Sequence, residues 1–235
     1  KPSAGLIADA VLSGAVGVVS DDTAGLYQFA GVDLPANTLT RAPLNIGHRG
    51  LPSSYPENTV EGSLAGYESG ADVIEIDIYV TKDGNLAVMH DGSSGRTCNK
   101  DLSIEGSTLA DLQALLVNKG FENNAQKNSF HLPSFEDYLK AFKGKDCRIF
   151  IEIKSTNPKT VPLMKEQIEQ YDMYDQCAVI TFHESQLQNL RKYYPEMSGG
   201  FLCGSYMGEF NPDADMRNVM SVIGKTNATL NPSFS

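Results

Sequence analysis

Short apolar runs that carry ionisable residues near their C-terminal ends constrain the fold of this chain more than any other feature. Four such β-branched runs hold the segments GHRG at 47–50, EID at 75–77, MH at 89–90 and EIK at 152–154. If these runs are neighbouring parallel strands, their ionisable side chains converge at one end of a single sheet. The pattern therefore predicts an α/β protein with a site at the carboxyl ends of its strands.

Strand-like and helix-like segments alternate along the rest of the chain. Strands are predicted at 16–20, 44–48, 73–80, 86–90, 148–153, 178–182, 199–203 and, more weakly, 228–231. Helices are predicted at 59–69, 108–117, 134–142, 160–171, 185–194 and 213–223, with Ser107 and Ser134 as N-caps of two of them. This alternation favours a parallel sheet built from βα units. The length of 235 residues suits one barrel-sized domain.

Two of the predicted strands have an isoleucine face and an ionisable face. Glu75 and Asp77 share one face of strand 73–80, and the isoleucines between and beside them share the other. Strand 148–153 repeats this pattern, with isoleucines on one face and Glu152 and the following Lys154 on the other. A half-exposed antiparallel strand with its acids in water is the alternative for either run alone. Both together fit a barrel better, with isoleucines toward the helices and charges at the mouth.

The composition excludes some partners and leaves other properties open. A net charge of −10 and the lack of a basic run argue against nucleic acid as a partner. No apolar stretch is long enough to span a bilayer, and the four scattered cysteines favour buried free thiols over a zinc site or disulfides. Because the chain begins at Lys1, we expect a leader or preceding domain to have been removed, and favour an extracytoplasmic location. The oligomeric state is not predicted.

The acidic residues indicate a metal site. Glu75, Asp77 and Glu152 would repel one another unless a cation lay between them. All-oxygen ligation suits a hard divalent ion, Ca²⁺ or Mg²⁺.

The histidines and the basic residues suit phosphate chemistry beside such an ion. His48 and His90 could act as general base and general acid in an in-line displacement at phosphorus. Arg49 and Lys154 could hold the phosphate oxygens. Each residue alone has a structural explanation, so the prediction depends on their conjunction.

The order of the motifs adds a resemblance to a known family. With GHRG, PENT at 56–59, EID, MHD at 89–91 and IEIK at 151–154, the chain resembles the glycerophosphodiester phosphodiesterase family from about residue 45 to its end. The segments GRT at 95–97, LPSFEDYL at 132–139 and AVITF at 178–182 extend the match.

The resemblance implies a TIM (β/α)8 barrel, with a small insertion after the third strand at residues 92–131. It also implies metal-dependent hydrolysis of a small-molecule glycerophosphodiester to sn-glycerol 3-phosphate and an alcohol. The implied roles are acid and base for His48 and His90, phosphate binding for Arg49 and Lys154, and metal ligation for three carboxylates. These ligands are Glu75, Asp77 and Glu152.

Both ends of the chain depart from the family pattern. The chain ends at TLNPSFS, where family members continue through two further strands, so we expect a barrel that is incomplete at its C-terminal end. Residues 1–43 are predicted to be an N-terminal extension to a barrel at 44–235. Within the extension, residues 13–26 resemble the family's last strand and its loop. They could be the tail of a preceding domain, a closing barrel strand or a coincidence.

Two other functions are compatible with the same motifs. One is a phosphodiesterase of the sphingomyelinase D or lysophospholipase D kind, which would need a longer apolar groove. The other is a catalytically silent barrel that binds phosphodiesters. All seven predicted site residues are present, which argues against the silent binder.

Overall fold

The computed structural model describes residues 16–28, 43–203 and 212–232. The strands are β1 (Gly17–Ser20), β2 (Leu44–Gly47), β3 (Val73–Val80), β4 (Leu86–Val88), β5 (Arg148–Ile153), β6 (Cys177–Thr181), β7 (Gly199–Cys203) and β8 (Thr229–Pro232). The α-helices are α2 (Thr23–Tyr27), α3 (Val60–Glu68), α4 (Leu109–Gln113), α5 (Phe135–Phe142), α6 (Thr160–Tyr171), α7 (Glu184–Tyr193) and α8 (Pro212–Thr226). Two 3₁₀ turns, η2 (Lys127–Ser129) and η3 (Tyr174–Gln176), complete the set.

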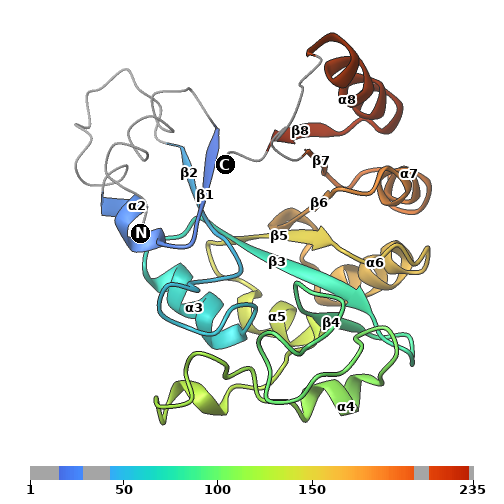
Figure 1. The fold of residues 1–235 in the computed structure, drawn as a ribbon. Helices are drawn as coiled ribbons and strands as arrows, with labels where there is room; N and C mark the ends of the chain where they lie inside the picture. The colour runs from blue at the N-terminus through green and yellow to red at the C-terminus, as the bar shows by residue number, and fades with distance from the viewer. Residues whose placement is uncertain (1–15, 29–42, 204–211, 233–235) are drawn as a thin grey trace.

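The strands form one curled sheet in the order β1-β2-β3-β5-β6-β7-β8, and every neighbouring pair in this series is parallel. Figure 1 shows the curved sheet with its open side toward the top of the view and helices α3, α5, α6 and α7 along its outer face. This is the predicted α/β barrel in incomplete form, since a closed (β/α)8 barrel has eight parallel strands. Among the described residues, β1 and β8 are the two edges of the series.

The isoleucine faces of β3 and β5 form the centre of the hydrophobic core. Ile74, Ile76 and Ile78 have no exposed surface and pack in one cluster with the buried side chains of α5 and α6. The isoleucines of β5 belong to the same cluster. The predicted orientation is therefore confirmed, and burial of each such side chain stabilises the fold by about 1.5–3 kcal/mol. The opposite faces of these strands are left for the ionisable residues.

Strand β4 differs from the expectation that it is another parallel strand. It pairs antiparallel with β3, through Ile78 with Val88 and Val80 with Leu86, and lies outside the parallel series. The physical reason is the connection at residues 81–85, which is too short for a parallel crossover and makes a hairpin with Gly84 at φ +79°. The hairpin returns the chain along β3, and the Met89 amide donates to the Asp77 carbonyl at 3.0 Å. His90 is thereby brought back toward the acidic residues.

The segment at residues 92–131 lies between β4 and β5, where the insertion was predicted. It contains α4 and η2, and its buried residues Cys98, Ile104 and Leu112 form a second, smaller hydrophobic cluster with Ala87 of β4 and Met89. Because β4 is not in the parallel series, this insertion separates the barrel strands β3 and β5.

Capping explains where two of the helices begin. Ser134 and Asp137 form the capping box of α5, which confirms the predicted N-cap. For α4 the predicted cap is wrong by one residue: Thr108, rather than Ser107, accepts a hydrogen bond from the Asp111 amide. Helix α4 is also shorter than predicted.

Two composition-based expectations can be compared with the structure. Cys98, Cys147 and Cys177 are buried free thiols, and Cys203 is a partly exposed one. None of the helices in the described ranges combines the length and the apolar character needed to cross a membrane.

Candidate active site

Three carboxylates from two adjacent strands at the centre of the sheet meet on one face. Glu75 and Asp77 lie on β3, and Asp77 is the register partner of Glu152 on β5. One oxygen from each residue lies within 4.8 Å of the others. Asp77 has no exposed surface, Glu75 is 2% exposed and Glu152 is 8% exposed. The alternation of side chains along two parallel strands in register is what brings the three acids together.

The electrostatics of this cluster suit a bound cation. Glu75 Oε1 and Asp77 Oδ1 are buried and make no hydrogen bond. Burial, followed by repulsion from Asp77 and Glu152, raises the pKa of Glu75 well above its usual range. Burial and Asp77 also raise the pKa of Glu152, although the neighbouring Lys154 opposes this shift. A hard divalent cation would use the unpaired oxygens and remove the repulsion, so the residues present fit such an ion.

Each of the two predicted catalytic histidines has a carboxylate on its Nδ1 atom. His48 follows β2, and its Nδ1 lies 2.8 Å from Asp21 Oδ1. His90 follows β4, and its Nδ1 lies 2.6 Å from Asp91 Oδ1. Because an ionised carboxylate can only accept, Nδ1–H is the donor in both pairs, and the Nε2 atom of each neutral ring carries a lone pair.

The pKa values of the two partner acids support their ionised state. The hydrogen bond to His48 is the main cause that lowers the pKa of Asp21. Burial acts to raise the pKa of Asp91, but hydrogen bonds from Arg96 and His90 outweigh it and the pKa lies below its usual range.

Lys154 connects the acidic cluster to one of the histidines. Its Nζ atom lies 2.8 Å from Glu152 Oε1, 3.3 Å from His90 Nε2 and 3.9 Å from Asp77 Oδ1. The lysine follows β5 directly, so its side chain reaches across the carboxyl ends of β3 and β5. The ammonium group can donate to His90 Nε2 only when that ring is neutral.

Arg49 approaches the same cluster from the loop after β2. Its backbone amide donates to Glu75 Oε2 at 3.0 Å, and its guanidinium lies 3.7 Å from Asp77 and 3.0 Å from Glu57. The residue has φ +54°, a conformation uncommon for a residue other than glycine. Direct contacts therefore connect six of the seven predicted residues, and His48 is the chain neighbour of one of them, Arg49.

Several further residues around the site were not predicted. Asn58 has φ +55° and donates from Nδ2 to Asp77 Oδ2 at 2.8 Å. Asn58 belongs to the PENT motif, whose last residue, Thr59, caps α3. Asn58 was missed because its partner is remote in the sequence. Asp21 was missed for the same reason.

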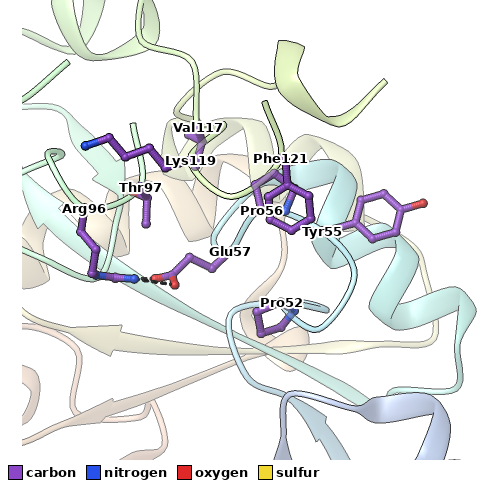
Figure 2. Close-up of a pocket in the computed structure, with 9 residues that line it drawn as sticks. All are labelled: Pro52, Tyr55, Pro56, Glu57, Arg96, Thr97, Val117, Lys119 and Phe121. Carbon is purple, nitrogen blue, oxygen red and sulfur yellow. Dashed lines mark hydrogen bonds and ion pairs between the residues drawn. The ribbon is translucent and has the colours of Figure 1, made fainter. Parts of the chain in front are cut away.

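An ion-pair network extends from Arg49 into the insertion. Glu57 accepts from Arg96 Nη1 at 2.8 Å and from Nη2 at 2.7 Å, while Arg96 Nε lies 2.5 Å from Asp91. Figure 2 shows the Glu57–Arg96 pair at one end of a pocket of about 130 Å³. The pocket is lined by Pro52, Tyr55, Pro56, Glu57, Arg96, Thr97, Val117, Lys119 and Phe121. Its walls come from the loop after β2 and from the insertion.

The fold and the site define a class: an α/β-barrel protein in which two adjacent parallel strands carry three carboxylates able to hold a metal ion. The sequence profile of the glycerophosphoryl diester phosphodiesterase family matches residues 48–218. The chain belongs to this family. The family resemblance seen in the motifs is thereby confirmed.

Individual relatives agree with this assignment. The chain is 30% identical to a glycerophosphodiester phosphodiesterase of Caldanaerobacter subterraneus subsp. tengcongensis. The aligned region of 166 residues covers 68% of each protein. It is 32% identical over 154 residues to a protein of the same name from Bacillus altitudinis, which covers 64% of this chain and 62% of that protein. The similarity thus spans about two thirds of these relatives.

Solved structures show the same fold at lower identity. An Oleispira antarctica phosphodiesterase in complex with the product sn-glycerol-3-phosphate has a TM-score of 0.66 at 18% identity, covering 81% of this chain and 83% of that one. A glycerophosphoryl diester phosphodiesterase structure from Silicibacter pomeroyi has a TM-score of 0.64 at 18% identity, covering 81% and 82%.

Proposed function

We propose that this protein hydrolyses glycerophosphodiesters to sn-glycerol 3-phosphate and an alcohol, using a divalent cation. The observation that carries the proposal is the buried carboxylate cluster of Glu75, Asp77 and Glu152, in which two oxygens make no hydrogen bond, with Arg49, Lys154 and His90 around it. Family membership supports the reaction class. The product named in the Oleispira antarctica structure supports the same choice of product.

The three carboxylates are the proposed ligands of Ca²⁺ or Mg²⁺. When bound, such an ion would supply Lewis-acid stabilisation of the charge on the phosphate. Asn58 keeps Asp77 in place through its Nδ2 hydrogen bond, and the Arg49 amide keeps Glu75 in place. Each of these two acids thus has one oxygen engaged by the protein and one oxygen that makes no hydrogen bond and could bind a ligand.

The histidines are the proposed proton carriers. One ring takes the proton of the attacking hydroxyl at Nε2 as the oxygen bonds to phosphorus. The other ring, protonated at Nε2, gives its proton to the departing alcohol oxygen as that P–O bond breaks. Asp21 and Asp91 accept the Nδ1–H hydrogen bonds throughout. Nε2 is therefore the nitrogen of each ring that gains or loses the transferred proton.

Arg49 and Lys154 are the proposed phosphate ligands. Arg49 can offer paired donors to two oxygens, whereas Lys154 acts as a point charge that can move from His90 to the substrate. The anionic diester is neutralised by these local cations although the protein as a whole carries a net charge of −10.

A silent phosphodiester binder remains the second candidate, and the activity assay decides between it and an enzyme.

The test is release of sn-glycerol 3-phosphate from glycerophosphocholine by purified protein in Ca²⁺, Mg²⁺ or EDTA. Glu75→Gln is the site variant, and Glu166→Gln, on the exposed side of α6, is the matched control. Metal-dependent release that Glu75→Gln loses and Glu166→Gln keeps is the expected result. Absence of release with either metal, while the diester still binds in calorimetry, would overturn the enzymatic proposal in favour of the binder.

The source of the attacking oxygen is a separate question. A free hydroxyl of the glycerol could attack phosphorus and expel the alcohol, so that water then opens a cyclic phosphate; direct attack by water is the alternative. We favour the cyclic route. Detection of cyclic glycerophosphate during early turnover would support it, whereas ¹⁸O incorporation with no trapped cyclic species would support direct attack.

A further inference from the structure

Strand β1 takes part in the sheet although it lies outside the residues matched by the family profile. It pairs in parallel with β2 along its whole length, from Gly17 with Leu44 to Ser20 with Gly47. The backbone ladder extends one residue further, because the His48 amide donates to the Ser20 carbonyl at 3.1 Å. In a (β/α)8 barrel, the neighbour on this side of the first strand is the closing strand. β1 occupies that position.

The turn and helix after β1 are packed closely against the same part of the barrel. Leu26 of α2 is 1% exposed, and the Thr23 carbonyl accepts from Asn45 Nδ2 at 2.8 Å. Gly70, at φ +96°, accommodates Tyr27, whose ring would lie 2.6 Å from a Cβ at that position. These contacts make the segment at residues 17–27 an integral part of the wall beside β2.

The first residue after β1 is Asp21, and its carboxylate meets the proposed catalytic histidine. Asp21 Oδ1 lies 2.8 Å from His48 Nδ1. The side chains of Asp21 and His48 are 62% and 35% exposed, so the pair by itself adds little stability. Its effect is geometric: the backbone bond to Ser20 sets the distance between the two residues, and the carboxylate then selects the Nδ1–H tautomer.

We propose that Asp21 is a positioning residue for His48, and that strand β1, which ends one residue before Asp21, is a functional part of the catalytic barrel. The inference rests on the proposed function, since it assigns His48 a proton to transfer. Asp21 orients the imidazole so that Nε2 faces the reacting oxygens, and it stabilises the ring when Nε2 is protonated. It touches neither substrate nor metal ligand in this role.

The same arrangement occurs at the second histidine, which strengthens the argument. Asp91 holds His90 Nδ1 at 2.6 Å, so both rings are fixed by a carboxylate on the same nitrogen. For His90 the acid is the next residue in the chain. For His48 the acid is Asp21, which follows a different strand and lies 27 positions earlier in the chain. Both rings must be oriented if both transfer protons, and at His48 the residue after β1 provides the orienting carboxylate.

The first experiment reads the imidazole directly and needs no activity. Protein labelled with ¹⁵N-histidine, kept free of metal, is compared with Asp21→Asn and Asp21→Ala by long-range ¹H–¹⁵N NMR, with the His48 signals assigned through His48→Gln. The control is Asp22→Asn, because asparagine also serves as an N-cap and leaves α2 intact. We expect the Nδ1–H form of His48 in the wild type and in Asp22→Asn, and a shift toward Nε2–H in both Asp21 variants. An unchanged tautomer would overturn the inference.

The second experiment separates positioning from substrate binding. Proton transfer contributes about 10²–10⁴-fold to such reactions, so loss of orientation at one ring should lower kcat by about 10- to 100-fold. KM should change by less than about threefold, since the phosphate ligands are untouched. Asp22→Asn should retain both constants. Equal kcat values in Asp21→Ala and the wild type would contradict the inference.

The two experiments also distinguish failure of this inference from failure of the proposed function. If Glu75→Gln abolishes turnover while Asp21→Ala retains it, the enzyme assignment stands and the role of Asp21 is wrong. If the wild type shows no turnover but the His48 tautomer depends on Asp21, the proposed reaction is wrong, whereas the structural coupling of β1 to the site stands.

Discussion

Lys154 Nζ lies 2.8 Å from Glu152 Oε1, and this contact opposes the repulsion within the acidic cluster. Burial and Asp77 raise the pKa of Glu152, while the hydrogen bond and charge of Lys154 lower it. The lysine therefore helps to keep a proposed metal ligand ionised. Because a carboxylate must lose its proton to bind a metal, the contact makes metal affinity dependent on Lys154.

Lys154→Met should weaken metal binding most at low pH. Without the lysine, the pKa of Glu152 rises further, so Glu152 stays protonated to a higher pH and the ion must displace a proton. Calorimetric titration with Ca²⁺ or Mg²⁺ at pH 6 and pH 8 measures the effect. The ratio of the two affinities should be larger in Lys154→Met than in the wild type. The exposed Lys82→Met serves as the control, and equal ratios in all three proteins would refute the prediction.

Glu75→Gln should stabilise the metal-free protein near neutral pH. Burial and two neighbouring acids raise the pKa of Glu75, so the stability associated with its protonated form is present at low pH and lost as the pH rises through the folded-state pKa. Glutamine at position 75 stays uncharged, so the variant avoids this loss of stability as the pH rises. Thermal unfolding in EDTA should give a higher Tm for the variant at pH 7 and similar Tm values near pH 4.

Addition of metal should reverse this order. A ligand at 100 times its Kd stabilises the folded state by about 2.7 kcal/mol, and Glu75→Gln should lose most of that gain. Equal metal-induced Tm increases in the two proteins would show that Glu75 is not a ligand.

Glu57→Gln should destabilise the protein at pH 7 but not in acid. Burial acts to raise the pKa of Glu57, but Arg96 and Arg49 outweigh it, so the pKa lies below its usual range. The stability from this network is present above the ordinary carboxyl pKa of about 4.3 and is lost as the pH falls through the folded-state value. Loss of the charged hydrogen bonds should cost about 1–3 kcal/mol in urea unfolding at pH 7. Glu166→Gln is the matched control, and a cost that is independent of pH would contradict this explanation.

Asn58 variants should separate its backbone role from its contact with Asp77. The residue has φ +55°, which glycine adopts freely and aspartate tolerates. Asn58→Gly removes the donor to Asp77, whereas Asn58→Asp places a second acid against a fully buried carboxylate. We expect both variants to lower Tm in EDTA at pH 7, with the larger decrease for Asn58→Asp. A larger decrease for Asn58→Gly would indicate that the donor matters more than the charge.

The local patterns of the chain were sufficient for most of the architecture. Isoleucines at alternate positions of β3 and β5 predicted which face is buried, because side-chain alternation in a strand is a local property. The same alternation predicted that Glu75, Asp77 and Glu152 share the opposite face. The direction of β4 was predicted wrongly, since periodicity identifies a strand without specifying its partner, and only the short hairpin makes it antiparallel.

The sequence by itself determined the strand and helix series, because alternation is a local property, and the family, because its short motifs occur in a fixed order; the same motifs supplied the seven proposed site residues. Only the tertiary structure decided that β1 lies beside β2, that Asp21 meets His48, that Asn58 holds Asp77 and that Glu57 joins Arg49 to Arg96. These contacts join side chains from different elements, and no local periodicity encodes them. They depend on strand pairing and core packing, which place residues remote in the sequence next to one another. Polar groups brought together in this way, and shielded from water, are nearly always hydrogen-bonded.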